Sequence, residues 1–371
     1  MKKLFLGAGC ASLMLFSSCN NNDDGGGDSV SSDTIVTTVA EDKVNINATL
    51  DEMVVCLGAM RNGAMLNSLV SFAGLSEGEA MKEEFIEDVF SNIETEIDKI
   101  DIPEDNQFHI DLFTGTWSYN LTNTTWSRSN SPSNKIVIEF PSDDTQTSNN
   151  AKIVLAGYAD KKYYFDDEDV FLPKTFDIEM SVDGSKICGV RLEDIVYEQS
   201  SEFAIPVSIN CSMFMSPFTM TVSGDRSTGT KFECEMALDD GSGCGYGMSA
   251  ELNLAHNDYE NIDDEDFVDL KGDFFHNDLK LDYFVDLAKL IKLDNLNDDI
   301  TDDQINDNID FAISLKSSKV ANLILREGND DFEVRILYKD GTSENSSVYY
   351  ESFADDVEAL FSDITGAWED I

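Results

Sequence analysis

Short runs in which apolar and polar residues alternate are the feature that most constrains the fold of this chain. The clearest run, residues 176–183, reads Phe-Asp-Ile-Glu-Met-Ser-Val-Asp. Because successive side chains of a strand point to opposite faces, this run predicts a strand with one apolar and one solvated face. That pattern is typical of antiparallel sheets. The Asp183-Gly184 pair that follows favours a tight hairpin turn.

Similar alternating runs recur along the chain without a fixed repeat. They predict strands near residues 116–120, 135–140, 187–197, 204–214, 217–223, 230–238, 244–255, 310–315, 321–326 and 332–338. So many short strands predict one large, twisted antiparallel sheet, mainly over residues 110–280, which could curve into a half-barrel. We therefore expect a single α+β domain over residues 34–371.

Three segments have a helical period instead. Residues 49–100 predict an N-terminal αα-hairpin, because Gly74 interrupts the apolar stripe and Ser76 with Glu79 forms a capping-box pattern. Residues 281–293 predict a second helical segment. A third stripe predicts a C-terminal amphipathic helix, through Phe353, Val357, Leu360, Phe361, Ile364 and Trp368. We expect the hairpin and the C-terminal helix to pack on the apolar face of the sheet.

The charge balance excludes some partners. The chain has 25 basic and 73 acidic residues, for a net charge of −48. Nucleic-acid binding depends on Lys and Arg displacing counterions from phosphates, so we expect no nucleic-acid partner. Attraction to anionic lipid headgroups is disfavoured for the same reason. The hydrophobic content of 42% with 10% aromatic residues is typical of a globular protein.

The first residues have the composition of an export signal. Lys2 and Lys3 supply a positive start, residues 4–16 are apolar, and Ser17 and Ser18 precede Cys19. The apolar run is too short to span a bilayer, so it predicts a cleaved leader, residues 1–18, rather than a membrane anchor.

Small residues followed by Cys19 resemble a bacterial lipobox. That resemblance implies cleavage between Ser18 and Cys19, diacylation of Cys19, and attachment to a membrane through this lipid. Cys10 would leave a much shorter apolar run. The stretch Asn-Asn-Asn-Asp-Asp after Cys19 resembles the acidic export signal of Bacteroidetes surface lipoproteins, although it lacks the preceding Lys or Gln. The resemblance implies an outer-membrane location facing the cell exterior.

A flexible linker is expected between the anchor and the folded domain. Residues 19–33 are rich in Gly, Asn, Asp and Ser and contain no apolar cluster. Ser29 and Thr34 each follow Asp and precede an apolar residue, which resembles the O-glycosylation sequon of Bacteroidetes. The alternative is an unmodified spacer.

Five cysteines remain after the leader and the lipidated Cys19: Cys56, Cys188, Cys211, Cys234 and Cys244. An odd number cannot form a closed set of disulfides. Strand parity places Cys211 and Cys234 among apolar residues, so we expect them to be small buried side chains. A hairpin at residues 239–243 would not place Cys234 opposite Cys244, so we expect no bridge between them.

The sequence contains no recognisable catalytic or metal-binding motif. It has only three histidines and lacks a nucleophile elbow, a phosphate loop and a dinucleotide fingerprint. The acidic segments 258–269 and 294–303 could supply oxygen ligands to Ca²⁺, but they lack the Gly and the closing Glu of an EF-hand. We therefore expect solvated loops, no metal, no cofactor and a non-catalytic protein.

The apolar strand positions include an unusual number of methionines, whose flexible side chains suit loosely defined hydrophobic ligands. The residues proposed to form a hydrophobic-ligand face are Phe176, Met180, Met213, Met220, Phe232, Met236 and Met248. The simpler interpretation is a closed core. An alternative function, capture of a surface glycan, depends on Trp117, Tyr119 and Trp126 forming an exposed aromatic platform. The sequence thus favours a lipoprotein that binds a hydrophobic ligand or has a structural role.

Overall fold

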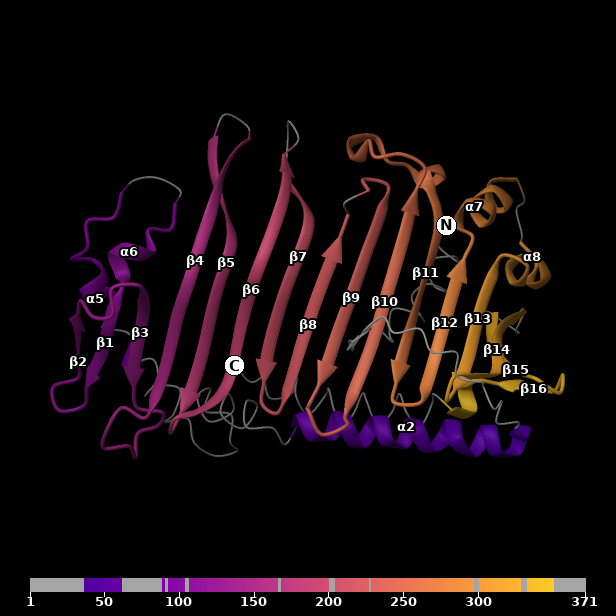
Figure 1. The fold of residues 1–371 in the computed structure, drawn as a ribbon, viewed down its shortest axis with the longest axis horizontal. Helices are drawn as coiled ribbons and strands as arrows, with labels where there is room; N and C mark the ends of the chain where they lie inside the picture. Colours follow the sequence, from indigo (N-terminus) through magenta and orange to yellow (C-terminus); the bar gives the residue numbers. More distant parts are fainter. Residues whose placement is uncertain are drawn as a thin grey trace, which may run out of the picture. The chain divides into compact units, whose positions relative to one another are not determined.

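The computed structural model describes residues 37–61, 89–90, 93–103, 107–165, 168–199, 204–226, 228–296, 300–327 and 332–349. Within these ranges the chain forms a large mixed sheet of sixteen strands, which is not closed, together with five α-helices (Figure 1). The chain divides into two compact units. Unit 1 comprises Met1–Leu57 and Met220–Ala359, and unit 2 comprises Gly58–Thr219 and Leu360–Ile371. Each unit is described by itself.

Unit 2 contains the first seven strands and two short helices. The strands are β1 (Gly115–Asn120), β2 (Thr125–Ser129), β3 (Lys135–Phe140), β4 (Ala151–Phe165), β5 (Glu168–Val182), β6 (Ser185–Gln199) and β7 (Ala204–Met215). The helices are α5 (Ile93–Ile97) and α6 (Ile110–Phe113). β1 pairs with β3 in parallel, whereas β1 with β2 and β3 through β7 pair antiparallel. The core of unit 2 gathers around Trp117, Trp126 and Phe140, with α5 residues packed against it.

Unit 1 contains the remaining strands. They are β8 (Phe218–Asp225), β9 (Lys231–Asp239), β10 (Gly245–Leu254), β11 (Phe267–His276), β12 (Leu279–Val285), β13 (Ile309–Leu315), β14 (Ser318–Glu327), β15 (Phe332–Tyr338) and β16 (Ser343–Asn345). From β9 to β16 each strand pairs antiparallel with the next. The cross-strand registers keep the apolar positions of these strands on one face and the charged positions on the other.

Helix α2 (Val39–Arg61) crosses the turn ends of the unit 1 strands, as Figure 1 shows along the lower edge of the sheet. A capping box between Thr38 and Glu41 begins the helix. Ile46 packs into the core formed by β12 to β15. Near the start of the helix, Lys43 Nζ lies 2.5 Å from a Glu344 carboxylate oxygen.

The other helices of unit 1 are short. Helix α7 (Leu287–Leu296) packs against β11, and α8 (Asp302–Asn306) packs against β14. Two 3-10 helices, η1 (Tyr259–Asn261) and η2 (Asp264–Asp266), precede β11. Among the described residues, no helix has both the length and the apolarity to cross a membrane.

The structure confirms the predicted large sheet, accompanied by few helices, but finer predictions differ from it. The sheet is mixed rather than purely antiparallel, because of the β1–β3 pair. The predicted αα-hairpin at 49–100 is not supported: its first helix begins at Val39, and the later described helical residues are only 89–90 and α5. The turn of that hairpin and the predicted C-terminal helix lie outside the described residues.

The prediction of a helix over residues 281–293 is wrong over its first half. Residues 279–285 form β12, and the helix α7 begins only at Leu287. The reason is visible in the register, because Leu279, Leu281 and Tyr283 pair with successive alternate residues of β11 on one face. The alternation of β12 with period two was hidden by the helical residues that follow it.

Candidate functional site

Nine residues on the apolar face of unit 1 form a regular patch across β9, β10 and β11. The cross-strand registers arrange them in three rows, which from the α2 end outward are Met236–Met248–Phe274, Cys234–Ala250–Gly272 and Phe232–Leu252–Leu270. All nine residues are half-buried. These nine residues are the β9–β11 patch.

The middle row of the β9–β11 patch consists of small residues between two rows of large ones. At Gly272 a Cβ atom would lie 2.0 Å from the Ser249 carbonyl oxygen and 2.6 Å from the Tyr283 hydroxyl, so glycine is required there. Tyr283 lies over this position and donates a hydrogen bond of 2.9 Å to the Ser249 carbonyl. Burial, with smaller contributions from Asp273 and Cys234, raises the pKa of Tyr283 to about 12, so its hydroxyl remains a donor. Tyr283 therefore covers Gly272, which is the end of the small-residue row nearest to β12.

At the α2 end, the patch meets the buried core. Leu238, Tyr246 and His276 form the next row and are almost completely buried. The Tyr246 hydroxyl donates to the Met53 carbonyl of α2 at 2.7 Å. α2 is therefore attached directly to the strands that carry the patch.

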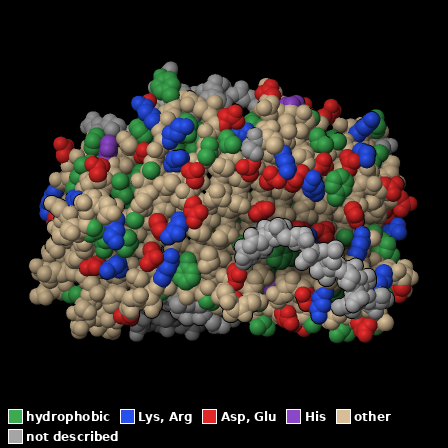
Figure 2. Space-filling view, viewed as in Figure 1, with side chains coloured by type: hydrophobic (Ala, Val, Ile, Leu, Met, Phe, Trp, Pro, Cys, Tyr) green, Lys and Arg blue, Asp and Glu red, His purple; other side chains and the backbone are tan. Residues whose placement is uncertain are grey.

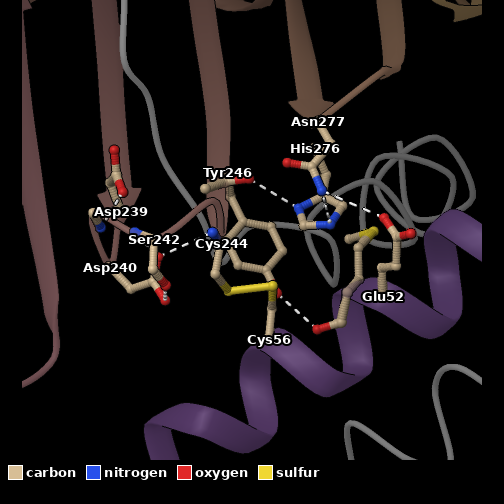
Figure 3. Close-up of a disulfide and its surroundings, with 12 residues drawn as sticks. Glu52, Cys56, Asp239, Asp240, Ser242, Cys244, Tyr246, His276 and Asn277 are labelled. Atoms are coloured by element: carbon tan, nitrogen blue, oxygen red, sulfur yellow. Dashed lines mark hydrogen bonds between the residues drawn. A yellow bond between two sulfur atoms is a disulfide. The ribbon is translucent and has the colours of Figure 1, made fainter.

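A disulfide strengthens this attachment. Cys56 of α2 is bonded to Cys244, immediately before β10, and Figure 3 shows the bond beside the Tyr246 ring. The two Cα atoms are 5.6 Å apart, within the usual range for a disulfide. Asp240 holds the hairpin loop that carries Cys244, because its carboxylate accepts the Cys244 backbone N–H at 3.0 Å.

His276 is a structural residue at this end of the patch. Its side chain is fully buried, and burial lowers its pKa, against the opposing effect of its hydrogen bond to the Gly245 carbonyl. Nδ1 lies 2.8 Å from that carbonyl and Nε2 lies 3.2 Å from Asn277 Nδ2. These contacts, which Figure 3 draws, fit a neutral ring that donates from Nδ1 and accepts at Nε2.

At the opposite end of the patch, an arginine and two aromatic rings are packed together. Arg226 follows β8, and its side chain is buried, with the residue only 3% exposed. Its guanidinium carbon lies 4.5 Å from the centroid of the Tyr259 ring and 5.9 Å from that of Phe232. The two rings meet edge to face at 5.6 Å. Phe232 belongs to the β9–β11 patch, so the patch ends beside a buried cation.

The other face of these strands is polar. Glu251 of β10 lies between two lysines, with Lys271 Nζ at 2.8 Å and Lys231 Nζ at 3.1 Å. Lys280 of β12 lies 2.9 Å from Asp273 of β11. Figure 2 shows acidic and basic side chains interspersed over the surface that it draws. Such paired charges on neighbouring strands favour a solvated face.

The structure brings together only some of the residues proposed for the hydrophobic-ligand face. Phe232, Met236 and Met248 all belong to the β9–β11 patch, and Met236 pairs directly with Met248. Met220 lies on β8, the neighbour of β9 in the strand order. The remaining three belong to unit 2, where they share the apolar face of β5 to β7: Phe176, Met180 and Met213.

The proposed aromatic platform for a glycan is wrong. Trp117, Tyr119 and Trp126 are all buried in the core of unit 2, with at most 7% of each residue exposed. The Trp117 indole donates to the Phe113 carbonyl at 2.9 Å, and the Trp126 indole donates to the Val89 carbonyl at 2.6 Å. Because these rings are buried against other core residues, they cannot stack on a sugar.

The Cys56–Cys244 bridge was missed by the sequence reasoning. The two residues are 188 positions apart, and no local pattern links them. Cys188, Cys211 and Cys234 are free, and burial raises the pKa of each thiol. These thiols are therefore poor nucleophiles at neutral pH.

The described part of the two acidic segments does not assemble a metal site. Among the residues that the structure describes, no group of three or more His, Cys, Asp or Glu side chains could hold a metal ion. Asp302 and Asp303 instead begin α8 behind the capping residue Thr301. In the segment 258–269, Asp263 caps η2 through a capping box.

Several predicted sites fall outside the described residues: Ser18, Cys19, Ser29 and Thr34. Comparison with known proteins adds no family, because no family model fits the chain and no curated protein or solved structure matches it.

Proposed function

We propose that this chain is a non-catalytic, lipid-anchored envelope protein whose β9–β11 patch binds a hydrophobic ligand. The observation that carries the proposal is the half-burial of all nine patch residues beside a row that is almost completely buried. Apolar surface of this kind is typical of binding sites. Met236 and Met248 supply flexible side chains that adapt to an apolar ligand.

The middle row supports the same proposal. Cys234 and Ala250 have shorter side chains than the Met, Leu and Phe residues on either side of them. The surface of the patch is therefore recessed along this row at β9 and β10. A ligand chain lying there would contact both flanking rows. Burial of apolar surface contributes roughly 25 cal/mol per Å², so even a narrow chain would gain useful affinity.

The proposed location is the outer membrane, with the folded chain outside the cytoplasm and facing the cell exterior. Cys19 would carry the lipid, and residues 20–33 would separate it from the fold. The Cys56–Cys244 disulfide supports this proposal, because disulfides persist in oxidising compartments and are rare in the cytoplasm. The glycan alternative loses its basis, since its three rings are buried.

The direct test is a titration of residues 20–371 with N-phenylnaphthylamine, an uncharged apolar dye that fluoresces when removed from water. Replacing Ala250 with Phe fills the small-residue row, so we expect dye affinity to fall by at least about tenfold. The matched control is Ala312→Phe. Ala312 pairs with Asp282 and Asn322 on the polar face, so this variant should bind the dye normally.

Equal dye affinity in the wild type and Ala250→Phe would contradict the proposal. The competing occupant of the patch is the chain's own C-terminal segment, with its helical spacing of apolar residues from Phe353 to Trp368. If the dye binds only after residues 350–371 are removed, the patch is part of a closed core rather than a ligand site.

A further inference from the structure

The face of β9, β10 and β11 that carries the patch continues for one more row, and α2 crosses the strands at that row. Leu238, Tyr246 and His276 extend the cross-strand registers of the β9–β11 patch, but at most 5% of each residue is exposed. Met53 of α2 is also buried, and its carbonyl accepts the Tyr246 hydroxyl at 2.7 Å. Figure 3 shows the Tyr246 ring pointing towards this part of the helix, beside His276. The helix therefore bounds the patch at this end.

The two halves of α2 are held to the strands in different ways. The first half pairs Lys43 with Glu344 of β16, with 2.5 Å between their charged atoms. The second half carries the disulfide from Cys56 to Cys244. On its outer side the second half is open to solvent, since Val55 is 75% exposed. Breaking the disulfide therefore removes an attachment of the second half and leaves the ion pair of the first half in place.

We infer that the Cys56–Cys244 disulfide is a redox switch for ligand binding at the β9–β11 patch. In an oxidising environment the bridge persists, and α2 limits the patch to three rows. Reduction lets the second half of α2 open locally, and the row of Leu238, Tyr246 and His276 then joins the patch. Successive rows on one face lie about 7 Å apart along a strand. This inference rests on the proposed function and names a regulation of the same site.

The chemical step is thiol–disulfide exchange with a dithiol reductant. A thiolate of the reductant attacks the Cys56 sulfur, because Cys56 is half-buried whereas Cys244 is only 7% exposed. The S–S bond breaks, Cys244 leaves as a thiolate and takes up a proton, and a mixed disulfide forms at Cys56. The second thiol of the reductant then displaces Cys56, which is released as a thiol. The two cysteines gain two electrons and two protons, and the reductant is oxidised to a disulfide.

The test is a titration of residues 20–371 with N-phenylnaphthylamine before and after reduction by dithiothreitol, without denaturant. We expect the reduced chain to bind the dye about tenfold more tightly, a gain that needs only about 55 Å² of added apolar contact. Replacing Cys56 and Cys244 with Ser should give the higher affinity with or without dithiothreitol. The matched control is Cys211→Ser, which removes a free thiol and should respond to dithiothreitol as the wild type does.

Hydrogen exchange followed by mass spectrometry on the same samples locates the opening. After reduction, the backbone amides of residues 50–61 should exchange almost as fast as in an unfolded chain. The amides of β13 to β15 should remain slow, because these strands belong to the core that Ile46 of the first half packs against. If residues 50–61 stay protected after reduction, the second half of α2 does not open, and the inference is overturned whatever the dye does.

The dye results separate the two proposals. If the dye binds equally well before and after reduction, the redox switch is overturned while the hydrophobic-ligand proposal stands. If the dye binds in neither state, both are overturned. Ala250→Phe should weaken dye binding in both states. A reduced Ala250→Phe chain that binds as tightly as the reduced wild type would overturn the link between the bridge and the β9–β11 patch.

Discussion

At the scale of single residues, Glu251 shows how the polar face is stabilised. Hydrogen bonds from Lys271, Asn253 and Lys231 outweigh its burial and lower the pKa of Glu251 from 4.5 to about 2. Because the folded state holds this carboxylate ionised, Glu251 contributes stability at every pH above about 4.5. That contribution is lost as the pH falls from about 4.5 towards 2.

The corresponding prediction concerns Glu251→Gln. In urea denaturation, the wild type should be more stable than the variant at pH 6, and the difference should shrink steadily between pH 4.5 and pH 2. The matched control is Glu235→Gln, an exposed carboxylate on the same face of β9, which should show a smaller pH-dependent difference. A wild-type advantage that is unchanged at pH 2 would contradict the role of the ionised Glu251.

Residue-level signals also decided which site residues could be predicted. Met236 and Met248 were found because strand alternation alone assigns them to the apolar face. Arg226 was missed, since a single arginine after a strand has no pattern that distinguishes it from a surface residue. The tryptophans were misread for a similar reason: sequence parity shows that Trp117 and Tyr119 share a face, but not that this face is covered.

At the scale of elements, the buried residues of α2 show why the sequence predicts a helix from residue 49 although the helix begins at Val39. Its buried positions are Asp42, Ile46, Thr49 and Met53, which have helical spacing but are half polar. A stripe of apolar residues is therefore not visible before Thr49. Asp42 is buried because Lys339, in the turn after β15, lies 2.7 Å from its carboxylate. Such a contact depends on tertiary structure and leaves no local trace in the sequence.

The disulfide between α2 and the β9–β10 hairpin is expected to stabilise the fold. Replacing Cys56 and Cys244 with Ser should lower the free energy of unfolding by about 2–5 kcal/mol, the usual effect of losing a native disulfide. The measurement is urea denaturation with and without dithiothreitol. The reductant should bring the wild type to the stability of the double variant and leave the variant itself unchanged.

The control for this prediction is Cys211→Ser, because Cys211 is a free, half-buried thiol of unit 2. It should retain the response of the wild type to dithiothreitol. If the reductant leaves the wild-type midpoint unchanged, the bridge does not form in solution, and α2 is held by its noncovalent contacts alone.

At the scale of the whole molecule, the alternation of apolar and polar residues in short runs predicted the large sheet and the positions of most of its strands. The long strand β4 and the edge strand β2 were missed because their apolar residues are interrupted by Lys161 and Lys162 in one case and by hydroxyl residues in the other.

The net charge of −48 and the proposed lipid anchor fit a protein that stays separated from its neighbours at a membrane surface. We propose, more narrowly, that the β9–β11 patch is an open binding surface rather than part of a closed core. The most direct measurement is mass spectrometry of an organic extract from residues 20–371, purified without the lipid anchor, alongside the Ala250→Phe variant. We expect a stoichiometric apolar molecule in the wild-type extract and its loss from the variant. An empty wild-type extract, together with no binding of N-phenylnaphthylamine added to the protein, would contradict this proposal.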